Sequence, residues 1–174
     1  MFKLRVPKES IESWASRYSE FYDDSEVEAL GHTARGAGYL TADQFRKIAR
    51  WKTPRSQSRC LKNSETIVRE VTAAAFSASE PRFKIEVLRL LDGVDWPTAS
   101  VFLHFCDKEP WPIIDYRAFW SLSQGSPAGS YSFALWTSYS DYTRQLAKEL
   151  NVSMRVLDRA LWAYSKVKQP KAGA

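Results

Sequence analysis

Apolar residues recur at every third or fourth position along most of the chain, which is the period of an amphipathic α-helix. The stretch from Glu9 to Tyr22 shows the period first, with its apolar side at Ile11, Trp14, Ala15, Tyr18 and Phe21. No segment alternates apolar and polar residues over a useful length, as a half-buried strand would. The pattern therefore predicts an all-α protein.

Short local motifs predict where helices begin and where the chain turns. Helix starts are expected at the capping boxes Ser25–Glu28 and Thr41–Gln44, at Asn63 or Ser64, and at the first-turn proline Pro81. Residues 31–38 hold three of the seven glycines and predict a loop, as do residues 125–129. The first loop lacks the preceding strand and the following Lys-Ser/Thr of a phosphate-binding P-loop. A polar tail is expected from Lys166 to Ala174.

A tight turn is expected within the segment from Leu91 to Ser100, which we name the hairpin. One helix ends there, the chain turns around Gly93, and a second helix starts near Trp96. That second helix is apolar almost all round, so we expect it to run through the middle of the protein. Backbone N–H groups at such a turn, with a helix dipole behind them, are a natural site for a phosphate.

The length of 174 residues and the 44% content of hydrophobic residues suit a single domain with a sizeable core. We expect one all-helical domain over residues 1–174, with a core around the hairpin at about 81–122. The amino- and carboxyl-terminal helices are expected to pack together.

Neither a targeting segment nor a membrane span is expected. The chain opens on charged sequence, Met1-Phe2-Lys3-Leu4-Arg5, and no apolar stretch reaches the roughly 18 residues of a membrane span. Cys60 and Cys106 are too few for a disulfide framework or a four-cysteine metal site, and there are only two histidines. We therefore expect a cytoplasmic protein, nucleoid-associated if prokaryotic, with no metal and no cofactor.

Positive charge is concentrated in one stretch from Gln44 to Ser64, which we name the basic segment. Its charged residues are all basic: Arg46, Lys47, Arg50, Lys52, Arg55, Arg59 and Lys62. The net charge of the whole chain is +5, so the remainder is close to neutral. Such a local patch favours a polyanionic partner, and Trp51 beside Lys52 and Arg55 is a combination that stacks bases and pairs with phosphates.

The hairpin together with a downstream aspartate resembles the helix-hairpin-helix DNA glycosylase superfamily, the endonuclease III-like enzymes. Their pattern is Leu-Pro-Gly-Val-Gly-x-Lys-Thr-Ala, an apolar helix, and then an apolar pair and an Asp before another helix. The positions that match are Leu91, Gly93, Val94, Thr98, Ala99 and Asp115. The match covers about residues 83–122, less than a quarter of the chain. The resemblance implies a two-lobed, all-helical fold with its site in a cleft between the lobes.

Three departures from the family pattern limit the chemistry that the resemblance implies. Pro97 replaces the lysine that attacks the sugar in bifunctional members, which excludes a Schiff-base lyase step at that position. Monofunctional members also lack this lysine. The four-cysteine iron–sulfur motif of some members is absent. Asp92 and Asp95 replace the hairpin Pro and the second Gly, and their charges would repel DNA unless Asp95 caps its own helix.

The resemblance implies that Asp115 is the catalytic carboxylate, because a negative charge near the sugar stabilises an oxocarbenium-like transition state or orients the attacking water. The alternative is that Asp115 only caps the helix beginning at Tyr116. The expected DNA contacts are Gly93, Val94, Asp95, Trp96, Thr98, Arg46, Arg50, Trp51, Lys52, Arg55, Arg59, Tyr116 and Arg117. For Trp96, packing over the hairpin is the alternative to a wedge inserted into DNA.

The function expected from these features is that of a monofunctional glycosylase. It would extrude a damaged or modified nucleotide from duplex DNA and hydrolyse the base–sugar bond without cutting the strand. Two alternatives stand beside it: a non-catalytic DNA-binding module of the same fold, and a helical protein-interaction adaptor, which the seven Trp, eight Tyr and nine Phe favour. The sequence leaves open which base is recognised, the choice between DNA and RNA, and the oligomeric state.

Overall fold

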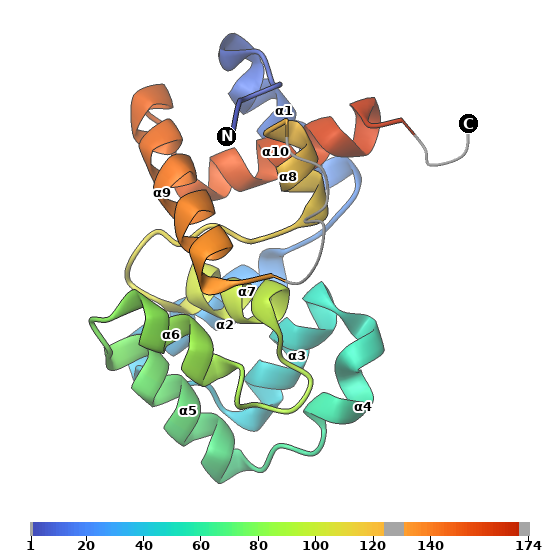
Figure 1. Ribbon diagram of the computed structural model, residues 1–174. Coiled ribbons are helices and arrows are strands. Elements are labelled where there is room, and N and C mark those ends of the chain that lie inside the picture. Colours follow the sequence, from blue (N-terminus) through green and yellow to red (C-terminus); the bar gives the residue numbers. More distant parts are fainter. Residues whose placement is uncertain (1, 124–130, 171–174) are drawn as a thin grey trace. The chain divides into compact units, whose positions relative to one another are not determined.

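The computed structural model describes residues 2–123 and 131–170, and every regular element in these ranges is a helix (Figure 1). The prediction of an all-α protein is confirmed. The chain forms two compact units. Unit 1 combines the residues up to Asp23 with those from Ile114 onward, and unit 2 runs from Asp24 to Ile113. Among the described residues, no helix is both long enough and apolar enough to cross a membrane.

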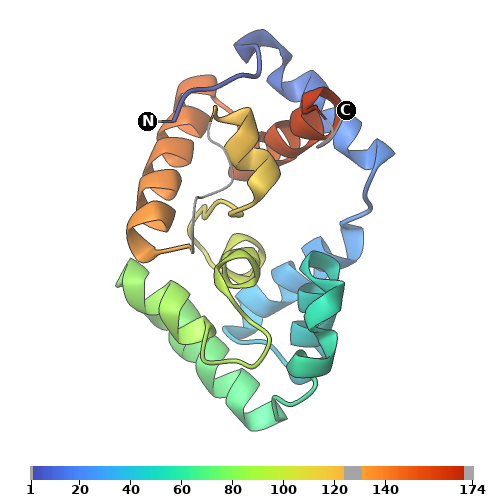
Figure 2. The same cartoon turned by 45° about the vertical axis from the view of Figure 1, so that its right-hand side comes forward.

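Unit 2 is built around one buried helix. Its elements are α2 (Ser25–Ala37), α3 (Ala42–Lys52), η3 (Pro54–Ser56), α4 (Gln57–Cys60), α5 (Glu65–Ser77), α6 (Pro81–Leu88) and α7 (Trp96–Cys106). Figure 2 looks nearly along α7, the yellow-green helix, which packs against α2, α3 and α6. Nine of its eleven residues are buried. The apolar character of this segment therefore predicted its central position in the unit correctly.

The glycine-rich stretch 31–38 is helical, not a loop, because α2 continues to Ala37 and ends at Gly38 in the left-handed conformation. Gly31 lies where α2 crosses α7. A Cβ atom on Gly31 would lie 2.5 Å from the carbonyl oxygen of Phe105 and 2.8 Å from its Cβ. The glycine is therefore needed for close packing of two helices, a requirement that local sequence does not reveal.

Several helix starts agree with the capping motifs. Thr41 and Gln44 form the complete capping box, and the Ser64 hydroxyl accepts a hydrogen bond from the Ile67 N–H. Pro81 is the first residue of α6. The box expected at Ser25 is wrong: Ser25 is already the first residue of α2, and the preceding residue, Asp24, makes no side-chain cap.

A buried ion pair joins the start of α6 to the end of α7. Lys84 Nζ lies 2.6 Å from Asp107 Oδ2, and both side chains are almost fully buried. The other carboxylate oxygen of Asp107 accepts a hydrogen bond from the Glu109 N–H at 2.9 Å. Because a buried charge without its partner is strongly unfavourable, this pair fixes the carboxyl end of α7.

Unit 1 packs α10 (Met154–Lys168) against α1 (Ile11–Arg17), α8 (Tyr116–Ser121) and α9 (Phe133–Leu150). The amino-terminal segment also belongs to this unit. The Lys3 and Arg5 N–H groups donate to the carbonyls of Leu122 and Ser121 at 3.0 and 2.8 Å. Residues from the two ends of the chain thus share one core.

Two elements of unit 1 differ from the sequence prediction. The helix expected from Glu9 to Tyr22 is broken into η1 (Lys8–Ser10), α1 and η2 (Tyr18–Glu20). The hydroxyls of Ser10, Ser16 and Ser19 donate to nearby carbonyls, and such bonds compete with regular helix geometry. The polar tail expected from Lys166 begins inside α10, which continues to Lys168. The last four residues of that tail and the loop expected at 125–129 lie outside the described residues.

Gly31→Ala tests the packing of α2 on α7. The added methyl group must displace the Phe105 backbone, so we expect a loss of about 1–3 kcal/mol in the free energy of unfolding, measured with urea. Gly36→Ala on the same helix is the matched control, because a Cβ atom there meets nothing within 4 Å. Gly36→Ala should stabilise the protein by up to about 1 kcal/mol. Equal effects of the two substitutions would contradict the account of Gly31.

Candidate functional site: the hairpin and the Asp115 helix

The hairpin turn requires glycine at position 93 for two reasons. Gly93 has a φ of +84°, in the left-handed region, and the Val94 N–H donates to the Leu91 carbonyl at 3.1 Å to close the turn. A Cβ atom on Gly93 would also lie 2.7 Å from Cys60 Sγ and 3.0 Å from the Cys60 nitrogen. The turn is thus pressed against α4 of the same unit.

The side chain of Asn63 ties this turn to the basic segment. Its Oδ1 accepts the Asp92 N–H at 2.8 Å, and its Nδ2 donates to the carbonyls of Asp92 at 2.9 Å and Cys60 at 3.0 Å. We name these three hydrogen bonds the Asn63 bridge. Asn63 is only 5% exposed, so the bridge is shielded from water and fixes the backbone on both sides. The sequence indicated Asn63 only as a possible helix cap.

The Asp95 carboxylate caps the amino end of α7. Its Oδ1 accepts the Trp96 N–H at 2.8 Å and lies 3.2 Å from Nε of Arg89. The Arg89 guanidinium in turn covers the Trp96 ring at 4.5 Å. The carboxylate therefore has a cationic partner, which reduces the repulsion that it would exert on a phosphate.

Three hairpin side chains expected at DNA instead pack inside unit 2. Trp96 is 5% exposed, which leaves it no freedom to act as a wedge, and Val94 and Thr98 are also buried. The Thr98 hydroxyl lies 3.3 Å from that of Thr53. What the hairpin offers a ligand is its backbone. Within the described part of the chain, the N–H groups of Gly93, Asp95 and Thr98 have no hydrogen-bond acceptor, so they are the donors left for an anion.

The basic segment lies beside these donors. Ser56 and Cys60 approach Gly93 directly, and the exposed basic residues next to them in the chain are Arg55, Arg59 and Lys62. The Arg59 guanidinium donates to the Ser56 hydroxyl at 3.4 Å, which holds the Arg59 side chain near the residue that approaches Gly93. Unit 2 therefore brings the hairpin and three cations to one surface, as a phosphate site requires.

Other members of the basic segment have different roles. Arg46 is half-buried and donates to the Asn63 carbonyl at 3.3 Å, so it supports the bridge residue instead of facing solvent. Trp51 packs edge-on against Phe105 at 5.5 Å. Lys52 is half-buried, and Arg50 is exposed near the carboxyl end of α3. Lys47 forms an ion pair with Asp43 at 3.0 Å.

Two exposed leucines lie near the hairpin. Leu90 is 73% exposed, and Leu61 is 58% exposed. Each lies two residues before an end of the Asn63 bridge, Leu90 before Asp92 and Leu61 before Asn63. Helical spacing in the sequence predicts that Leu90 and Leu91 face the core together. The prediction is wrong for Leu90, because α6 ends at Leu88 and only Leu91 is buried.

Asp115 belongs to unit 1 and caps α8, with Oδ1 accepting the Arg117 N–H at 2.9 Å. It also lies near the buried hydroxyl of Tyr139. The pKa of Tyr139 is raised well above its usual value, first by burial and then by the negative charges of Asp158 and Asp115. Asp115 is half-buried, between solvent and the aromatic core that contains Phe119 and Tyr139.

Tyr116 and Arg117 follow on the same helix. Tyr116 is 45% exposed. The Arg117 guanidinium lies 5.0 Å from the Tyr116 ring and 5.3 Å from the Trp162 ring. Asp115, Tyr116 and Arg117 thus form one local cluster in unit 1, while the hairpin and the basic segment form another in unit 2.

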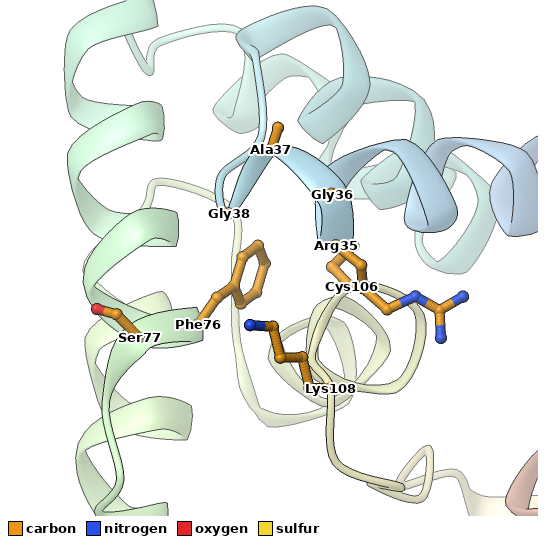
Figure 3. A pocket seen from close by; sticks show the side chains of 8 residues that line it. All are labelled: Arg35, Gly36, Ala37, Gly38, Phe76, Ser77, Cys106 and Lys108. Atoms are coloured by element: carbon orange, nitrogen blue, oxygen red, sulfur yellow. The ribbon is translucent and has the colours of Figure 1, made fainter.

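A separate pocket of about 190 Å³ opens at the carboxyl end of α7, at the opposite end of this helix from the hairpin. Figure 3 shows the Lys108 ammonium directed toward Phe76, while the Arg35 guanidinium points away. The carboxyl ends of α2, α5 and α7 meet here. Helix carboxyl ends carry partial negative charge, so the two cations have a structural explanation. Burial raises the pKa of the Cys106 thiol in the pocket wall, which makes it a poor nucleophile.

No group of three or more potential metal ligands occurs in residues 2–123 and 131–170. Comparisons with models of protein families, with curated proteins and with solved structures found no match to this chain.

Asn63→Ala tests the bridge. It leaves the Asp92 N–H and carbonyl without their partner and removes one of the two hydrogen bonds to the Cys60 carbonyl. We therefore expect a loss of about 2–4 kcal/mol in the free energy of unfolding and faster hydrogen exchange at the Asp92 amide. The matched control is Ser64→Ala, which removes a helix cap next to the bridge and should cost about 1 kcal/mol without exposing that amide. An unchanged exchange rate at Asp92 in Asn63→Ala would show that the bridge does not hold the turn.

Proposed function

We propose that the protein binds DNA through the hairpin and the adjoining basic segment, and that it hydrolyses the N-glycosidic bond of a damaged or modified base with Asp115 as catalytic carboxylate. The observation that carries the proposal is the contact of Gly93 with Ser56 and Cys60. It brings together a turn with unpaired N–H donors and a cationic stretch that lies more than thirty residues earlier in the chain.

In this proposal the hairpin anchors one phosphate group. The N–H groups of Gly93, Asp95 and Thr98 donate to its oxygens, and Arg55 and Arg59 pair with the phosphates beside it. Leu61 and Leu90 then meet the base pairs next to the anchored backbone. Apolar side chains inserted between base steps unstack them, which lowers the cost of extruding a nucleotide.

The chemistry assigned to Asp115 is hydrolysis by water. The bond between the base nitrogen and the anomeric carbon breaks, water forms the new bond to that carbon, and one proton of the water passes to the departing base. The Asp115 carboxylate stabilises the positive charge that develops on the sugar and orients the water. Pro97 carries no amine, so no Schiff base forms at that position and the strand stays intact.

A second candidate function is DNA binding without chemistry. It is favoured by the hydrogen bond from the Arg117 N–H to Asp115, because this bond gives the carboxylate a sufficient structural role as a helix cap. Both candidates predict the same hairpin surface, and they differ only in whether a base is released.

Arg55→Ala combined with Arg59→Ala tests the DNA surface. Binding to a short fluorescent duplex is measured over a range of salt concentrations. Each phosphate contact contributes about 0.9 to the slope of log K against log salt, so the double variant should lower the magnitude of that slope by about 1.8. Affinity at low salt should fall about tenfold.

Two single variants serve as controls for the binding experiment. Lys47→Ala removes a cation that is already paired with Asp43, so the slope should stay unchanged. Asp92→Asn removes an exposed negative charge beside the proposed phosphate and keeps the backbone bonds to Asn63, so affinity should rise. An Arg55 and Arg59 double variant with the wild-type slope would exclude this surface.

Asp115→Asn tests the chemistry. Asparagine also caps helices, so the fold and the duplex affinity should be retained. Base release from duplexes that carry a panel of modified bases is measured by alkaline cleavage at abasic sites, and it should fall by about 10²-fold or more. Undiminished release by the variant would remove Asp115 from the mechanism. A wild-type protein that binds duplex DNA and releases no base of the panel would contradict catalysis and support the second candidate.

A further inference from the structure

An aromatic cluster forms in unit 1 where the segment after α1 meets α10. The Trp162 ring lies 5.0 Å from that of Tyr22 and 5.3 Å from that of Tyr18, with the rings near perpendicular in both pairs. Tyr116 joins the cluster through Arg117, which lies over both the Tyr116 and Trp162 rings. These residues come from the two ends of the chain, 140 residues apart in the case of Tyr22 and Trp162.

Several cations lie close to the rings of this cluster. Lys166 lies 5.9 Å from the Trp162 ring, and Arg155 and Arg159 lie 5.1 and 5.8 Å from the Tyr18 ring. With Arg117 this gives five cation–ring pairs on three rings. Significant pairs of this kind occur roughly once per 70–80 residues in proteins.

The charge of this surface is mainly positive. Asp158, an acidic side chain beside Arg155 and Arg159, is buried and forms an ion pair with Arg155, and the half-buried Asp115 adjoins Arg117. Asp23, next to Tyr22, is exposed. Arg117 and Lys166 form no ion pair within the part of the chain that the structure describes, so both charges are available to a polyanion.

Two of these aromatic residues are exposed at the surface, although one face of the Tyr22 ring stacks on Tyr18. Tyr22 and Tyr116 are each 45% exposed, and Trp162 between them is half-buried. Base faces are hidden inside a duplex, so exposed rings stack only on unpaired bases. Cations beside stacking rings are the arrangement that binds single strands, with phosphates on the cations and bases on the rings.

We propose that Tyr22, Tyr116, Trp162, Arg117 and Lys166 form a platform that binds single-stranded nucleic acid. This platform goes beyond the proposed function, because it lies wholly within unit 1 and needs neither the hairpin nor hydrolysis. Since the Arg117 N–H donates to Asp115, the platform adjoins the carboxylate assigned to base release. An unpaired strand bound here would be held next to that group.

The test uses the full chain and a short oligothymidine, whose binding is followed by fluorescent-label anisotropy and by quenching of tryptophan fluorescence. Stacking contributes about 1–3 kcal/mol per base, so Tyr22→Ala should weaken binding about tenfold. Tyr22→Phe should retain most of the affinity, because the ring is what stacks. Lys166→Ala should lower the magnitude of the salt slope by about 0.7.

Phe83→Ala is the matched control, because Phe83 is an aromatic residue of similar exposure, 49%, on α6 of unit 2. It should leave oligothymidine binding unchanged. The proposal is overturned if the wild-type protein does not bind the oligonucleotide at low salt, if Tyr22→Ala binds as tightly as wild type, or if polyglutamate competes as well as the oligonucleotide does.

The outcome is distinguishable from that of the proposed function. Tyr22→Ala and Lys166→Ala should keep the duplex affinity that depends on Arg55 and Arg59. If the protein fails to bind oligothymidine through Tyr22, the duplex affinity that depends on Arg55 and Arg59 is unaffected. If duplex binding does not depend on Arg55 and Arg59, oligothymidine binding through Tyr22 is retained.

Discussion

The organisation of unit 2 depends on a single buried amide, the side chain of Asn63. It bonds the N–H and the carbonyl of Asp92 and the carbonyl of Cys60, and the two Asp92 groups have no other hydrogen-bond partner among the described residues. Because Arg46 donates to the Asn63 carbonyl, helix α3 is tied to the same residue. The bridge fixes the turn at Gly93 against α4, and the cations of the basic segment are placed beside the hairpin as a consequence.

Electrostatics around the hairpin favour an anion despite its two aspartates. Asp95 is paired with Arg89 and caps α7, so its charge is largely balanced within the protein. Asp92 is exposed, and the cations nearby outnumber it. The helix behind the turn is almost wholly buried and held at its far end by Lys84 and Asp107, so the N–H groups are presented on a rigid element. The proposed chemistry is carried by a different unit, in which Asp115 begins α8.

Features that depend on local sequence were predicted well, and features that depend on distant contacts were not. Helical periodicity predicted the fold class, and the apolar composition of α7 predicted its burial. Local capping motifs predicted the cap at Thr41 and offered Ser64 as one of two candidates for the next. Glycine content wrongly predicted a loop at residues 31–38, because the reason for Gly31, contact with Phe105, lies more than seventy residues away. The Asn63 bridge spans 29 residues, and the neighbours of Trp162 come from the other end of the chain. Arg46 counted as a surface cation because sequence alone does not show that its guanidinium turns toward Asn63.

The most direct test of the account is a backbone-amide NMR titration of the full chain with a short duplex. The account predicts that the largest shifts occur at the N–H groups of Gly93, Asp95 and Thr98, and that they disappear as salt is raised. The NMR signals of the amides near the pocket at Arg35 and Lys108 should not shift. Binding that leaves the three hairpin amides unmoved, or an absence of binding at low salt, would contradict the central claim that this turn is a phosphate site.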